Sequence, residues 1–443
     1  MKASPRDLVA ALRERGLVHQ VTDEALGPLS AKEPITAYIG FDPTADALHA
    51  GSLYPVMLLL HAALAGHRPI AVVGGGTGLI GDPSGRDSER PLMDPEHLKA
   101  NFESLSVQIT GLFSSAGLPG ACTVIDNAAW LGGLNLIEFL RDTGKHFTVN
   151  WMMAKDSVRA RLEDREQGIS YTEFSYMLLQ AHDFHHLWKS PEFRCRLQMG
   201  ASDQWGNITA GVELIRKKEG GTAYGLTCPL LLTEDGRKFG KSAGNAVWLE
   251  RGFTDDFTFY QFWMNLGDPV ASHLLAAYTL LPMAEVGEIR AAASRHPESR
   301  PCQRRLAYEV TRLVRGDDAA ERQEAIAHAF FGEGSVRTLD AATLEEAAQG
   351  LPVVDLPRSR MLGAPVFQIA KDALTSPRML PALSGGEVRR AFEQGGISIS
   401  GRAIRRGTRP DSPEAIAESD LLHGRYLVIR HGRRYCMVRA TGG

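Results

Sequence analysis

The sequence predicts an α/β protein in which a doubly wound parallel sheet is followed by an all-α domain and a small α+β domain. Three observations carry this prediction. Short apolar runs of β type alternate with helical stretches up to about residue 250, and strand signals then vanish up to about residue 344. The end of the chain combines a short helix, strand patterns and many arginines. We therefore expect domains at 1–250, 251–350 and 364–443, with a linker at 351–363.

The expected elements follow from the same patterns. The candidates for buried strands are Ile35–Ile39, Ile70–Val73, Thr123–Ile125, Cys195–Met199 and Thr227–Leu232. In the second domain we expect helices at Pro301–Arg315 and Ala319–Phe331. In the third we expect a helix at Glu387–Gly396 that two glycines end.

Composition limits the classes of function. A hydrophobic content of 44% and a charged content of 23% are ordinary for a soluble protein, and the net charge of −3 means that any nucleic-acid interface is a local patch. No apolar run approaches the length of a membrane span, and the first residues lack the apolar core of a signal peptide. The five cysteines are scattered without a C-x-x-C pair. We therefore expect a cytoplasmic protein with no membrane partner, no disulfide framework and no protein-bound metal.

Residues 38–52 predict a phosphate site at a helix N-terminus. An apolar run of β type breaks at Gly40 into a Gly/Asp/Pro turn, which brings His49 and Gly51 to the start of an apolar helix. The N–H groups and the positive dipole end at such a position favour an anion, and glycine lets a nucleotide approach closely. This stretch predicts that the first domain is a Rossmann-like nucleotide-binding sheet.

A second motif supplies positive charge. Gly236–Ser242 places Lys238 and Lys241 three residues apart, with glycine before and between them. Such a loop can close on the β- and γ-phosphates of ATP and stabilise departing pyrophosphate. The same composition alone is also typical of an ordinary exposed loop.

A third motif lies on a predicted helix. Ser170–Glu173 predicts a capping box at its start. Tyr176, Gln180 and Asp183 follow at i, i+4 and i+7, so they share one face of the helix. This stripe fits a binding pocket or an ordinary polar helix face.

Four separated motifs resemble those of bacterial tyrosyl-tRNA synthetases, which are class I enzymes, and they follow one another along the chain in the same order as in that family. Residues 38–52 are similar to the first signature, usually written HIGH, except that Ser52 stands at its last histidine. The helix that carries Tyr176 resembles the tyrosine-binding helix of the family. Gln198–Asn207 resembles its ribose- and carboxylate-binding segment, with Ala201 where a second glycine is usual, and Gly236–Ser242 resembles the KMSKS loop.

The resemblance extends over essentially the whole chain and assigns residues to parts of a reaction. The arginine-rich end is similar to an S4-type RNA-binding domain, and the all-α domain to an anticodon-binding domain. Contacts to the transition state are implied for His49, Ser52, Lys238, Lys241 and Ser242. The residues implied to bind tyrosine are Tyr38, Asp82, Tyr176, Gln180, Asp183 and Gln204. Those implied to bind ATP are Gly40, Asp42, Thr44, Gly51, Gly200, Asp203 and Lys241, and those implied to bind tRNA are Arg86, Arg389, Arg390, Arg402 and Arg405.

Selectivity has a physical reason in this scheme. Tyr38 and Asp183 would bond the phenolic hydroxyl of tyrosine, and phenylalanine would leave this buried pair unsatisfied. On the nucleotide side, Ala201 would cost about 1 kcal/mol if it needs a left-handed backbone.

A different motif favours another class of enzyme. Gly76–Gly81 matches the G-x-G-x-x-G pattern of dinucleotide-binding dehydrogenases. It follows a second strand rather than opening the domain, and Asp82 and Pro83 come next, where a long helix would be expected. The pattern is therefore a weak indication of a dehydrogenase.

The resemblance implies a tyrosine–tRNA ligase. ATP, as a substrate that carries Mg²⁺, and L-tyrosine would form tyrosyl-adenylate and pyrophosphate, and the tyrosyl group would pass to the terminal adenosine of tRNA(Tyr). A homodimer is implied, with Asn127–Trp130 and Phe139–Phe147 in the family's dimer region. Two alternatives stay open: a tryptophanyl-tRNA synthetase, and a synthetase-derived RNA-binding protein without catalysis.

Overall fold

The structure is a computed structural model that divides the chain into two compact units. It describes residues 4–84, 93–155, 158–159, 168–231, 239–242, 245–332, 334–432 and 434–442, with only the backbone described at 241, 242 and 245. Unit 1 comprises 1–253 and 266–306, and unit 2 comprises 254–265 and 307–443. None of the described helices is long and apolar enough to cross a membrane.

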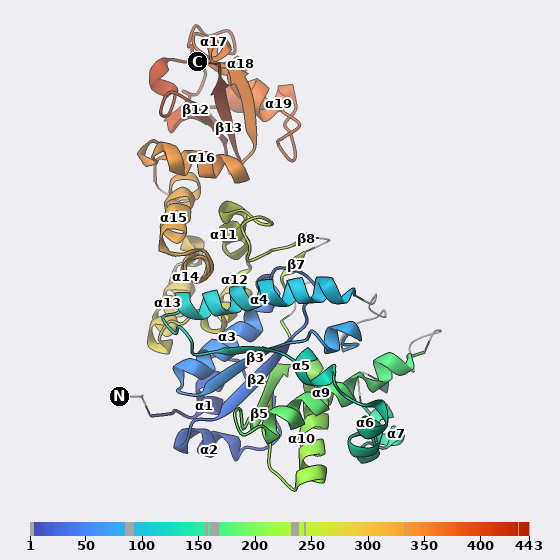
Figure 1. The fold of residues 1–443 in the computed structure, drawn as a ribbon. Helices are drawn as coiled ribbons and strands as arrows, with labels where there is room; N and C mark the ends of the chain where they lie inside the picture. Colours follow the sequence, from blue (N-terminus) through green and yellow to red (C-terminus); the bar gives the residue numbers. More distant parts are fainter. Residues whose placement is uncertain are drawn as a thin grey trace. The chain divides into compact units, whose positions relative to one another are not determined.

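Unit 1 is built on a six-stranded sheet (Figure 1). Its strands are β1 (Gln20–Val21), β2 (Thr36–Phe41), β3 (Arg68–Val73), β4 (Thr123–Asp126), β5 (Leu197–Ala201) and β6 (Tyr224–Cys228). They lie in the order β1-β6-β5-β2-β3-β4, and every neighbouring pair is parallel except β1 with β6. The chain winds outward from β2 in both directions, so the topological switch point lies between β2 and β5, where α/β sheets bind ligands.

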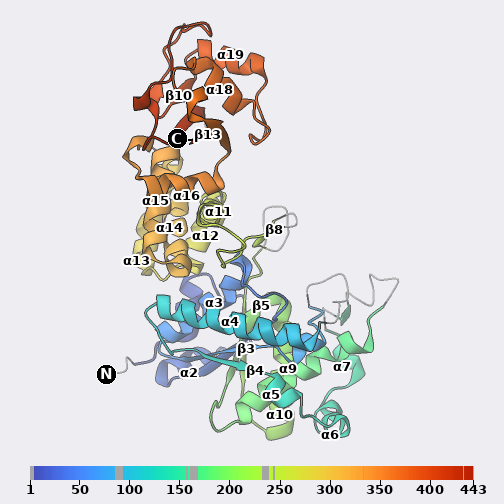
Figure 2. The ribbon, with the colours of Figure 1, turned by 45° about the horizontal axis from the view of Figure 1, so that its top comes forward.

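Helices cover both faces of this sheet. On one face lie α3 (Ala50–Leu64) and α4 (Pro95–Ser115), and on the other α9 (Tyr171–Lys189) and α10 (Trp205–Glu219), as Figures 1 and 2 show from two sides. The other helical elements among the described residues of the unit are α1 (Leu8–Glu14), α2 (Leu26–Lys32), η1 (Thr77–Leu79), α5 (Ala128–Leu131), α6 (Leu136–Asp142), η2 (Gly144–His146), α7 (Val149–Met153), η3 (Ser202–Gln204), α12 (Asp268–Ala277), α13 (Met283–Arg295), η4 (Pro297–Ser299) and the start of α14 (Pro301–Arg315). A short ribbon pairs β7 (Lys241–Ser242) with β8 (Asn245–Ala246).

Local sequence explains where the helices beside the site begin and end. Ser170 caps α9, because its hydroxyl accepts from the Glu173 N–H, as the capping-box pattern predicts. Met177 and Leu178 are buried in a cluster on one side of α9, which leaves the polar stripe on the other. Gly220, at φ 64°, ends α10 in a left-handed cap.

Unit 2 combines helices with a second sheet. Its helices are α11 (Asp256–Met264), the later part of α14 (Pro301–Arg315), α15 (Asp317–Phe331), α16 (Ala341–Gly350), α17 (Arg358–Met361), α18 (Val366–Leu374) and α19 (Gly385–Glu393), with short turns η5 (Val336–Thr338) and η6 (Glu418–Asp420). The sheet has the order β11 (Arg402–Ala403), β10 (Ile397–Ile399), β12 (Tyr426–His431), β13 (Arg434–Thr441) and β9 (Val353–Pro357). Two apolar clusters form its core.

The structure differs from the sequence prediction at 351–363. Residues expected to form a linker instead include strand β9, which pairs in parallel with β13. Pro352 and Pro357 favoured a linker, but a proline carbonyl can still accept: Met437 donates its N–H to the Pro352 oxygen. Because β9 is the edge strand of its sheet, the missing proline N–H groups break no ladder.

Two strand boundaries also differ. Residue Cys195 was expected to open a strand, but its N–H donates to the Leu187 carbonyl at the end of α9, so β5 begins at Leu197. The last parallel strand, β6, begins at Tyr224 rather than Thr227, and Pro229 follows its end. The expected helices of residues 301–315 and 319–331 are confirmed as α14 and α15.

Candidate active site

A cavity of about 210 Å³ opens at the carboxyl ends of β2 and β5, at the switch point of the sheet. Its lining comes from the strand ends, from the start of α3, from the loop after β3 and from the polar face of α9. The lining residues named by the sequence motifs are Tyr38, Gly40, Asp42, Asp82, Tyr176, Gln180, Asp183, Gly200 and Gln204. The cavity thus brings together all six residues predicted to bind tyrosine and part of those predicted to bind ATP.

One end of the cavity is built around a buried carboxylate. Asp183 accepts from the Asn127 Nδ2 atom at 2.9 Å and from the Trp130 Nε1 atom at 2.7 Å. Tyr38 reaches the same end from β2, with its ring 5.4 Å from that of Phe184. The Tyr38 hydroxyl is buried and has no hydrogen-bond partner among the described residues. A ligand hydroxyl placed here would satisfy both side chains.

Burial controls the protonation of this pair. It raises the pKa of Asp183 to about 7, although the hydrogen bonds from Asn127 and Trp130 act in the opposite direction. Burial, with the nearby Asp183 charge, also raises the pKa of Tyr38 well above its usual value. Tyr38 therefore remains a neutral donor, while Asp183 titrates near neutrality.

Asn127 and Trp130 are residues whose role the sequence did not reveal. The Asn127 oxygen accepts from the N–H groups of Gly76 and Thr77, and its Nδ2 atom donates to Thr77 Oγ1 as well as to Asp183. These partners fix which end of the amide faces the carboxylate. Trp130 is held in turn by the ring of His186, which stacks on it at 4.5 Å.

A second network, made of side-chain amides, surrounds Asp82, and only Asn207 among these amides is buried. Gln204 donates from Nε2 to Asp82 Oδ2 at 2.6 Å, and its oxygen accepts from Gln180 at 3.2 Å. The Asn207 Nδ2 atom lies between the oxygens of Gln180, Gln204 and Ser84, at 3.1 to 3.3 Å. Asn207 ends the segment Gln198–Asn207, where the sequence predicts no role for it, because its position at the centre of the network depends on the fold.

The charge of this network suits a cationic group. Asp82 is buried, and its bonded partners are neutral amides and the Ser84 N–H. Among the described residues no cationic side chain is bonded to it. A substrate ammonium beside Asp82, Gln180 and Tyr176 would supply the missing charge.

The other end of the cavity is built mainly from backbone. The turn after β2 is tied to α4, because Asn101 donates to the Pro43 carbonyl and Ser104 to the Asp46 carbonyl. This turn delivers His49 to the N-cap of α3, where its Nδ1 atom accepts from the Ser52 N–H at 3.1 Å. With Nδ1 accepting, a neutral ring carries its proton on Nε2.

The first turn of α3 offers fewer open N–H groups than its sequence suggests. The Ser52 N–H is bonded to His49, and the Ala50 N–H donates to the Val247 carbonyl at 2.7 Å. The predicted role of Ser52 in the chemistry rests on its side chain, and the bond the structure shows is made by its backbone.

The first signature, residues 38–52, and the KMSKS-like loop, Gly236–Ser242, meet at two glycines. A Cβ built on Gly51 would lie 2.5 Å from the Phe239 carbonyl oxygen, and one built on Gly240 would lie 2.3 Å from the Gly51 nitrogen. Gly240 also has a φ of +83°, a conformation that side chains rarely adopt. This close approach explains why both motifs need glycine. Lys238 lies outside the described residues, and Lys241 and Ser242 are described by backbone alone, in β7.

The remaining predicted nucleotide contacts lie at the strand ends. Gly40 has open space where a Cβ would stand, whereas a Cβ on Gly200 would make a tight contact of 3.1 Å with the Gln204 side chain. Asp203 lies in η3 directly after β5, and the Thr44 N–H donates to the Asp42 carbonyl. Ala201 has φ −77° and ψ 166°, so the strain considered for a left-handed backbone does not arise.

The G-x-G-x-x-G segment does not form a dinucleotide site. It folds into the single turn η1 instead of opening a long helix. The N–H groups of Gly75, Gly76 and Thr77 are already bonded to the side chains of Asp126 and Asn127, so they are not available to a pyrophosphate. The segment supports Asn127, and through it Asp183.

Comparison with known proteins identifies the family of the chain. Residues 30–332 match the family model described as "tRNA synthetases class I (W and Y)". The chain is 45% identical over 429 residues to the tyrosine–tRNA ligase of Roseiflexus castenholzii, covering 97% of this chain and 98% of that protein. It is 44% identical over 435 residues to that of Anaeromyxobacter dehalogenans, covering 98% and 99%. The chain belongs to the tyrosine–tRNA ligase family of class I synthetases.

Solved structures show the same fold. A C-terminally truncated mitochondrial tyrosyl-tRNA synthetase from Aspergillus nidulans superposes with a TM-score of 0.65 at 30% identity, covering 73% of this chain and 93% of that one. The tyrosyl-tRNA synthetase of Archaeoglobus fulgidus, solved with L-tyrosine, gives 0.53 at 17% identity. The class I fold predicted from the sequence is thus confirmed for this member of the family.

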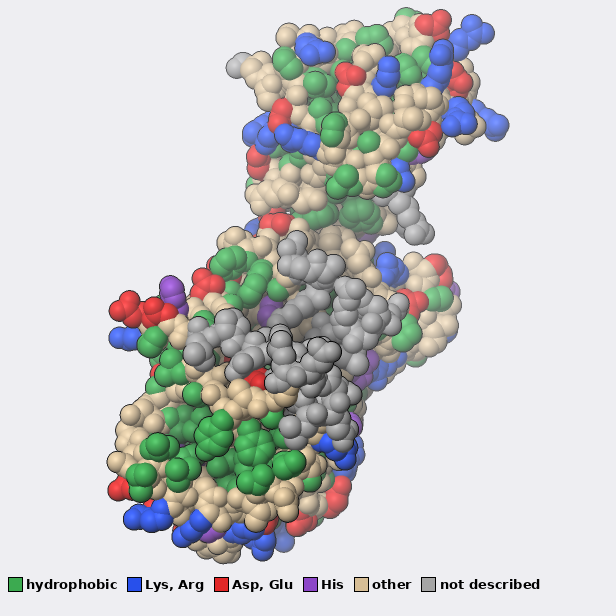
Figure 3. Space-filling model, turned by 90° about the vertical axis from the view of Figure 1, so that its right-hand side faces the viewer, with side chains coloured by type: hydrophobic (Ala, Val, Ile, Leu, Met, Phe, Trp, Pro, Cys, Tyr) green, Lys and Arg blue, Asp and Glu red, His purple; other side chains and the backbone are tan. Residues whose placement is uncertain are grey.

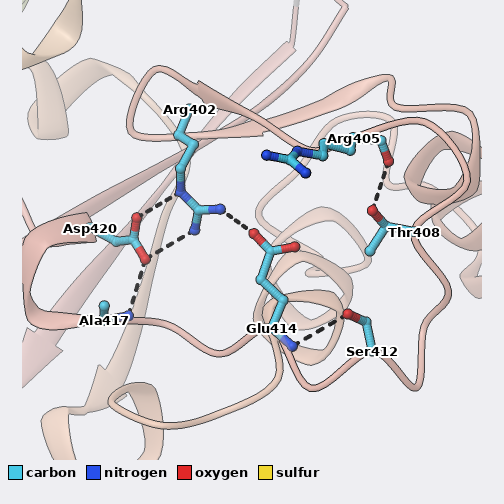
Figure 4. Close-up of polar contacts among 7 residues, drawn as sticks. All are labelled: Arg402, Arg405, Thr408, Ser412, Glu414, Ala417 and Asp420. Carbon is cyan, nitrogen blue, oxygen red and sulfur yellow. Dashed lines mark hydrogen bonds and ion pairs between the residues drawn. The ribbon is translucent and has the colours of Figure 1, made fainter.

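In unit 2 of this synthetase, the predicted RNA-binding arginines fall into two groups. Arg402 is held by two carboxylates: it bonds Asp420 through two nitrogens at 3.1 Å and also pairs with Glu414 (Figure 4). Arg389 pairs with Glu393 at 3.3 Å. By contrast, Arg390 and Arg405 are exposed with no carboxylate partner among the described residues. Arg86 lies outside the described residues.

The loop that carries Arg405 is fixed by the Arg402 cluster. Asp420 is buried and also accepts from the Ala417 N–H, while Thr408 closes a turn onto the Arg405 carbonyl (Figure 4). Arg406 and Arg409 on the same loop are exposed as well, and the sequence analysis did not single them out. The Gly407 N–H donates to the Glu393 carbonyl, which places this loop beside the end of α19, where Arg390 lies.

Unit 1 of the synthetase also has an apolar surface. Leu136, Ile137 and Val149 are 68%, 70% and 58% exposed, and Leu140 and Met153 lie beside them on α6 and α7. Figure 3 shows hydrophobic side chains gathered on this face. Exposed apolar patches are typical of interaction sites.

Proposed function

We propose that the chain activates L-tyrosine with ATP and transfers it to tRNA(Tyr). The observation that carries the choice of tyrosine is the Tyr38 and Asp183 pair, a buried donor without a partner beside a buried carboxylate. A phenolic hydroxyl satisfies both groups at once. An indole ring offers one N–H donor and no acceptor, so it would leave the Tyr38 hydroxyl unbonded.

In the first step, a tyrosine carboxylate oxygen attacks the α-phosphorus of ATP. The bond between the α-phosphorus and the oxygen that bridges to the β-phosphate breaks, and pyrophosphate leaves with the electron pair of that bond. We assign His49, through its Nε2 proton, together with Lys238 and Lys241, to the phosphate charge that develops, and Asp203 to the ribose. Ser52, Ser242, Gly40, Asp42, Thr44, Gly51 and Gly200 keep their predicted places around the nucleotide. The chemistry needs positioning and charge stabilisation, without a covalent nucleophile of the protein.

The substrate tyrosine is held at three points. Its ammonium lies beside Asp82, Tyr176 and Gln180, its carboxylate beside Gln204, and its hydroxyl between Tyr38 and Asp183. Mg²⁺ enters on ATP as part of the substrate. In the second step, a hydroxyl of the terminal ribose of tRNA attacks the carbonyl carbon of the adenylate, and AMP leaves.

We assign tRNA binding in unit 2 to the exposed arginines, Arg390, Arg405, Arg406 and Arg409, with Arg389 beside them and Arg86 in unit 1 as predicted contacts. Arg402 keeps a place in RNA binding through the loop that it positions. Each phosphate contact that is lost should lower the slope of log affinity against log salt by about 1. We expect this change in Arg405→Ala, whereas Arg402→Gln should lower the melting temperature, because it leaves buried Asp420 unpaired. Equal salt slopes in wild type and Arg405→Ala would contradict the assignment.

We further propose that two copies associate through the surface of Leu136, Ile137, Leu140, Val149 and Met153. Its exposed apolar area is typical of an interface. Sedimentation should give a dimer for the wild type and a monomer for Ile137→Asp with unchanged circular dichroism. A wild-type monomer would contradict this part. The five cysteines are all unpaired, which suits the reducing cytoplasm in which we place the enzyme.

Amino-acid-dependent exchange of pyrophosphate into ATP tests the function. We expect exchange with tyrosine and little with phenylalanine or tryptophan. Exchange with tryptophan alone would show a tryptophanyl enzyme. Binding of tRNA without exchange would show an RNA-binding protein that has lost catalysis.

A further inference from the structure

The nucleotide end of the cavity contains a second buried hydroxyl that the predicted mechanism does not use. Tyr54 lies on α3, in the second turn after His49, and lines the cavity beside Pro55. Tyr54 as a residue is 4% exposed, and its hydroxyl has no hydrogen-bond partner among the described residues. A buried hydroxyl without a partner costs about 1 to 3 kcal/mol. Such a group at a cavity wall points to a ligand.

The ring of Tyr54 is held rigidly. It stacks on Tyr278 with 5.6 Å between ring centroids and 13° between planes. Tyr278 is fully buried and donates from its hydroxyl to the Ala50 carbonyl at 3.0 Å. Its ring also meets that of Phe239, from the second signature, at 6.1 Å. The Tyr54 hydroxyl therefore has a fixed place relative to the first turn of α3.

The polar group that interacts with this hydroxyl is a weak partner. Cys228, the last residue of β6, lies beside Tyr54 and raises its pKa together with burial. Burial raises the pKa of the Cys228 thiol to about 12, so it stays neutral. A thiol hydrogen-bonds weakly, and no bond of good geometry forms here.

The position of Cys228 tells which substrate part lies near Tyr54. Cys228 pairs in register with Ala201, the last residue of β5, and Asp203 follows two residues later. Carboxyl ends of parallel strands bind the nucleotide in such sheets, with an acid after a strand at the ribose. The tyrosine end, around Asp183 and Asn127, is lined by other elements.

We propose that the Tyr54 hydroxyl forms a hydrogen bond with the adenosine part of ATP and is a specificity-determining residue for the nucleotide. The proposal rests on the adenylate-forming function proposed above. Without ATP the hydroxyl is buried and unsatisfied; with ATP it gains a partner. Tyr54 thus lowers the stability of the empty enzyme and contributes to nucleotide binding.

Tyr54→Phe separates these two effects. Removal of the unsatisfied hydroxyl should raise the melting temperature without nucleotide, and loss of one neutral hydrogen bond should raise KM for ATP about fivefold. The inhibition constant of adenosine should rise by the same factor. KM for tyrosine and KM for pyrophosphate in the reverse reaction should not change. Tyr224→Phe, at the opposite end of β6, is the matched control and should leave KM for ATP unchanged.

The outcomes are distinct. An unchanged KM for ATP and unchanged adenosine inhibition in Tyr54→Phe would overturn the proposal, as would a lower melting temperature without nucleotide. If the wild type shows no tyrosine-dependent exchange, the proposed function fails instead.

Discussion

The two ends of the cavity are built in different ways. At the tyrosine end, side chains bond to one another: Asn127 and Trp130 hold Asp183, and Gln204 and Asn207 hold the groups around Asp82. At the nucleotide end the protein approaches with backbone, through the first turn of α3, two glycines and the strand ends. The difference teaches where the sequence can vary. A side-chain network depends on each member, whereas a backbone contact tolerates changes of the side chain beside it.

The departures from the family pattern follow this division. Ser52 and Ala201 both lie at the nucleotide end. The bond that Ser52 makes to His49 comes from its N–H, and Ala201 has an ordinary extended backbone. Both residues can therefore differ from the usual pattern while the geometry around them is kept.

Loss of a residue from the side-chain network around Asp183 should have the largest effect on activity, measured as kcat/KM for tyrosine. Asn127→Ala removes a donor to Asp183 and leaves the Gly76 and Thr77 N–H groups without their acceptor. Two or three kcal/mol of lost stabilisation corresponds to a fall of about 100-fold in kcat/KM for tyrosine. Steady-state exchange kinetics measure it, with KM for ATP as the internal control. A normal kcat/KM would show that Asp183 is positioned without this network.

Closing the backbone approach should give the next largest effect. Gly240→Ala places a Cβ against the Gly51 nitrogen and requires a left-handed backbone in alanine. A cost of about 2 kcal/mol would lower the exchange rate about 30-fold. Gly252→Ala is the matched control, because open space surrounds Gly252 and its φ is not positive. Equal rates for the two variants would mean that the signatures need not touch during the reaction.

The pH dependence of tyrosine binding should be smaller. With a pKa of about 7 in the free enzyme, Asp183 accepts from the phenol mainly when ionised. From pH 6 to pH 8 the ionised fraction rises about tenfold, so kcat/KM for tyrosine should rise by up to about tenfold. A flat profile over this range would contradict the role of Asp183.

The same shift has a consequence for stability. The pKa of Asp183 is higher in the folded enzyme than in the unfolded chain, so the folded state binds the extra proton between the two values. The stabilisation that protonated Asp183 gives to the folded state is fully present below the pKa of the unfolded chain and is lost as the pH rises through about 7. Thermal melting of the ligand-free enzyme should therefore show a loss of stability over this range that is absent from Asp183→Asn.

The smallest effect is expected at the departure itself. Ser52→His restores the residue that is usual in the family motif, and the backbone N–H of residue 52 still donates its hydrogen bond to His49. We expect KM for ATP to change by less than about threefold, within about 0.6 kcal/mol. A change of tenfold or more would show that the side chain at this position, rather than the backbone, contacts the nucleotide.

Sequence reasoning and structure agree where chemistry is local. The strand–turn–helix of residues 38–52 and the stripe of Tyr176, Gln180 and Asp183 follow from turn residues and helical spacing, and the structure places them at one cavity. The sequence placed Asn127 only in the family's dimer region, and its role beside Asp183 was missed because its partners are 50 and 56 residues away along the chain. No local pattern marks such a residue.

The linker and the arginines teach the same lesson. Strand β9 pairs with β13, which lies close to the C-terminal end of the chain. Because Pro352 and Pro357 favour a linker, the sequence did not predict this pairing. In the same unit, sequence counts arginines but does not show which ones the protein uses internally. Arg402 is paired with buried Asp420, while Arg406 and Arg409 remain exposed.

Pyrophosphate exchange with tyrosine and phenylalanine, measured in the wild type and in Asn127→Ala, tests the central claim most directly. If the side-chain network around Asp183 reads the phenolic hydroxyl, the wild type should strongly prefer tyrosine and the variant should lose most of that preference, with KM for ATP unchanged. A variant that keeps the full preference would contradict the account, as would a wild type that activates both amino acids equally well.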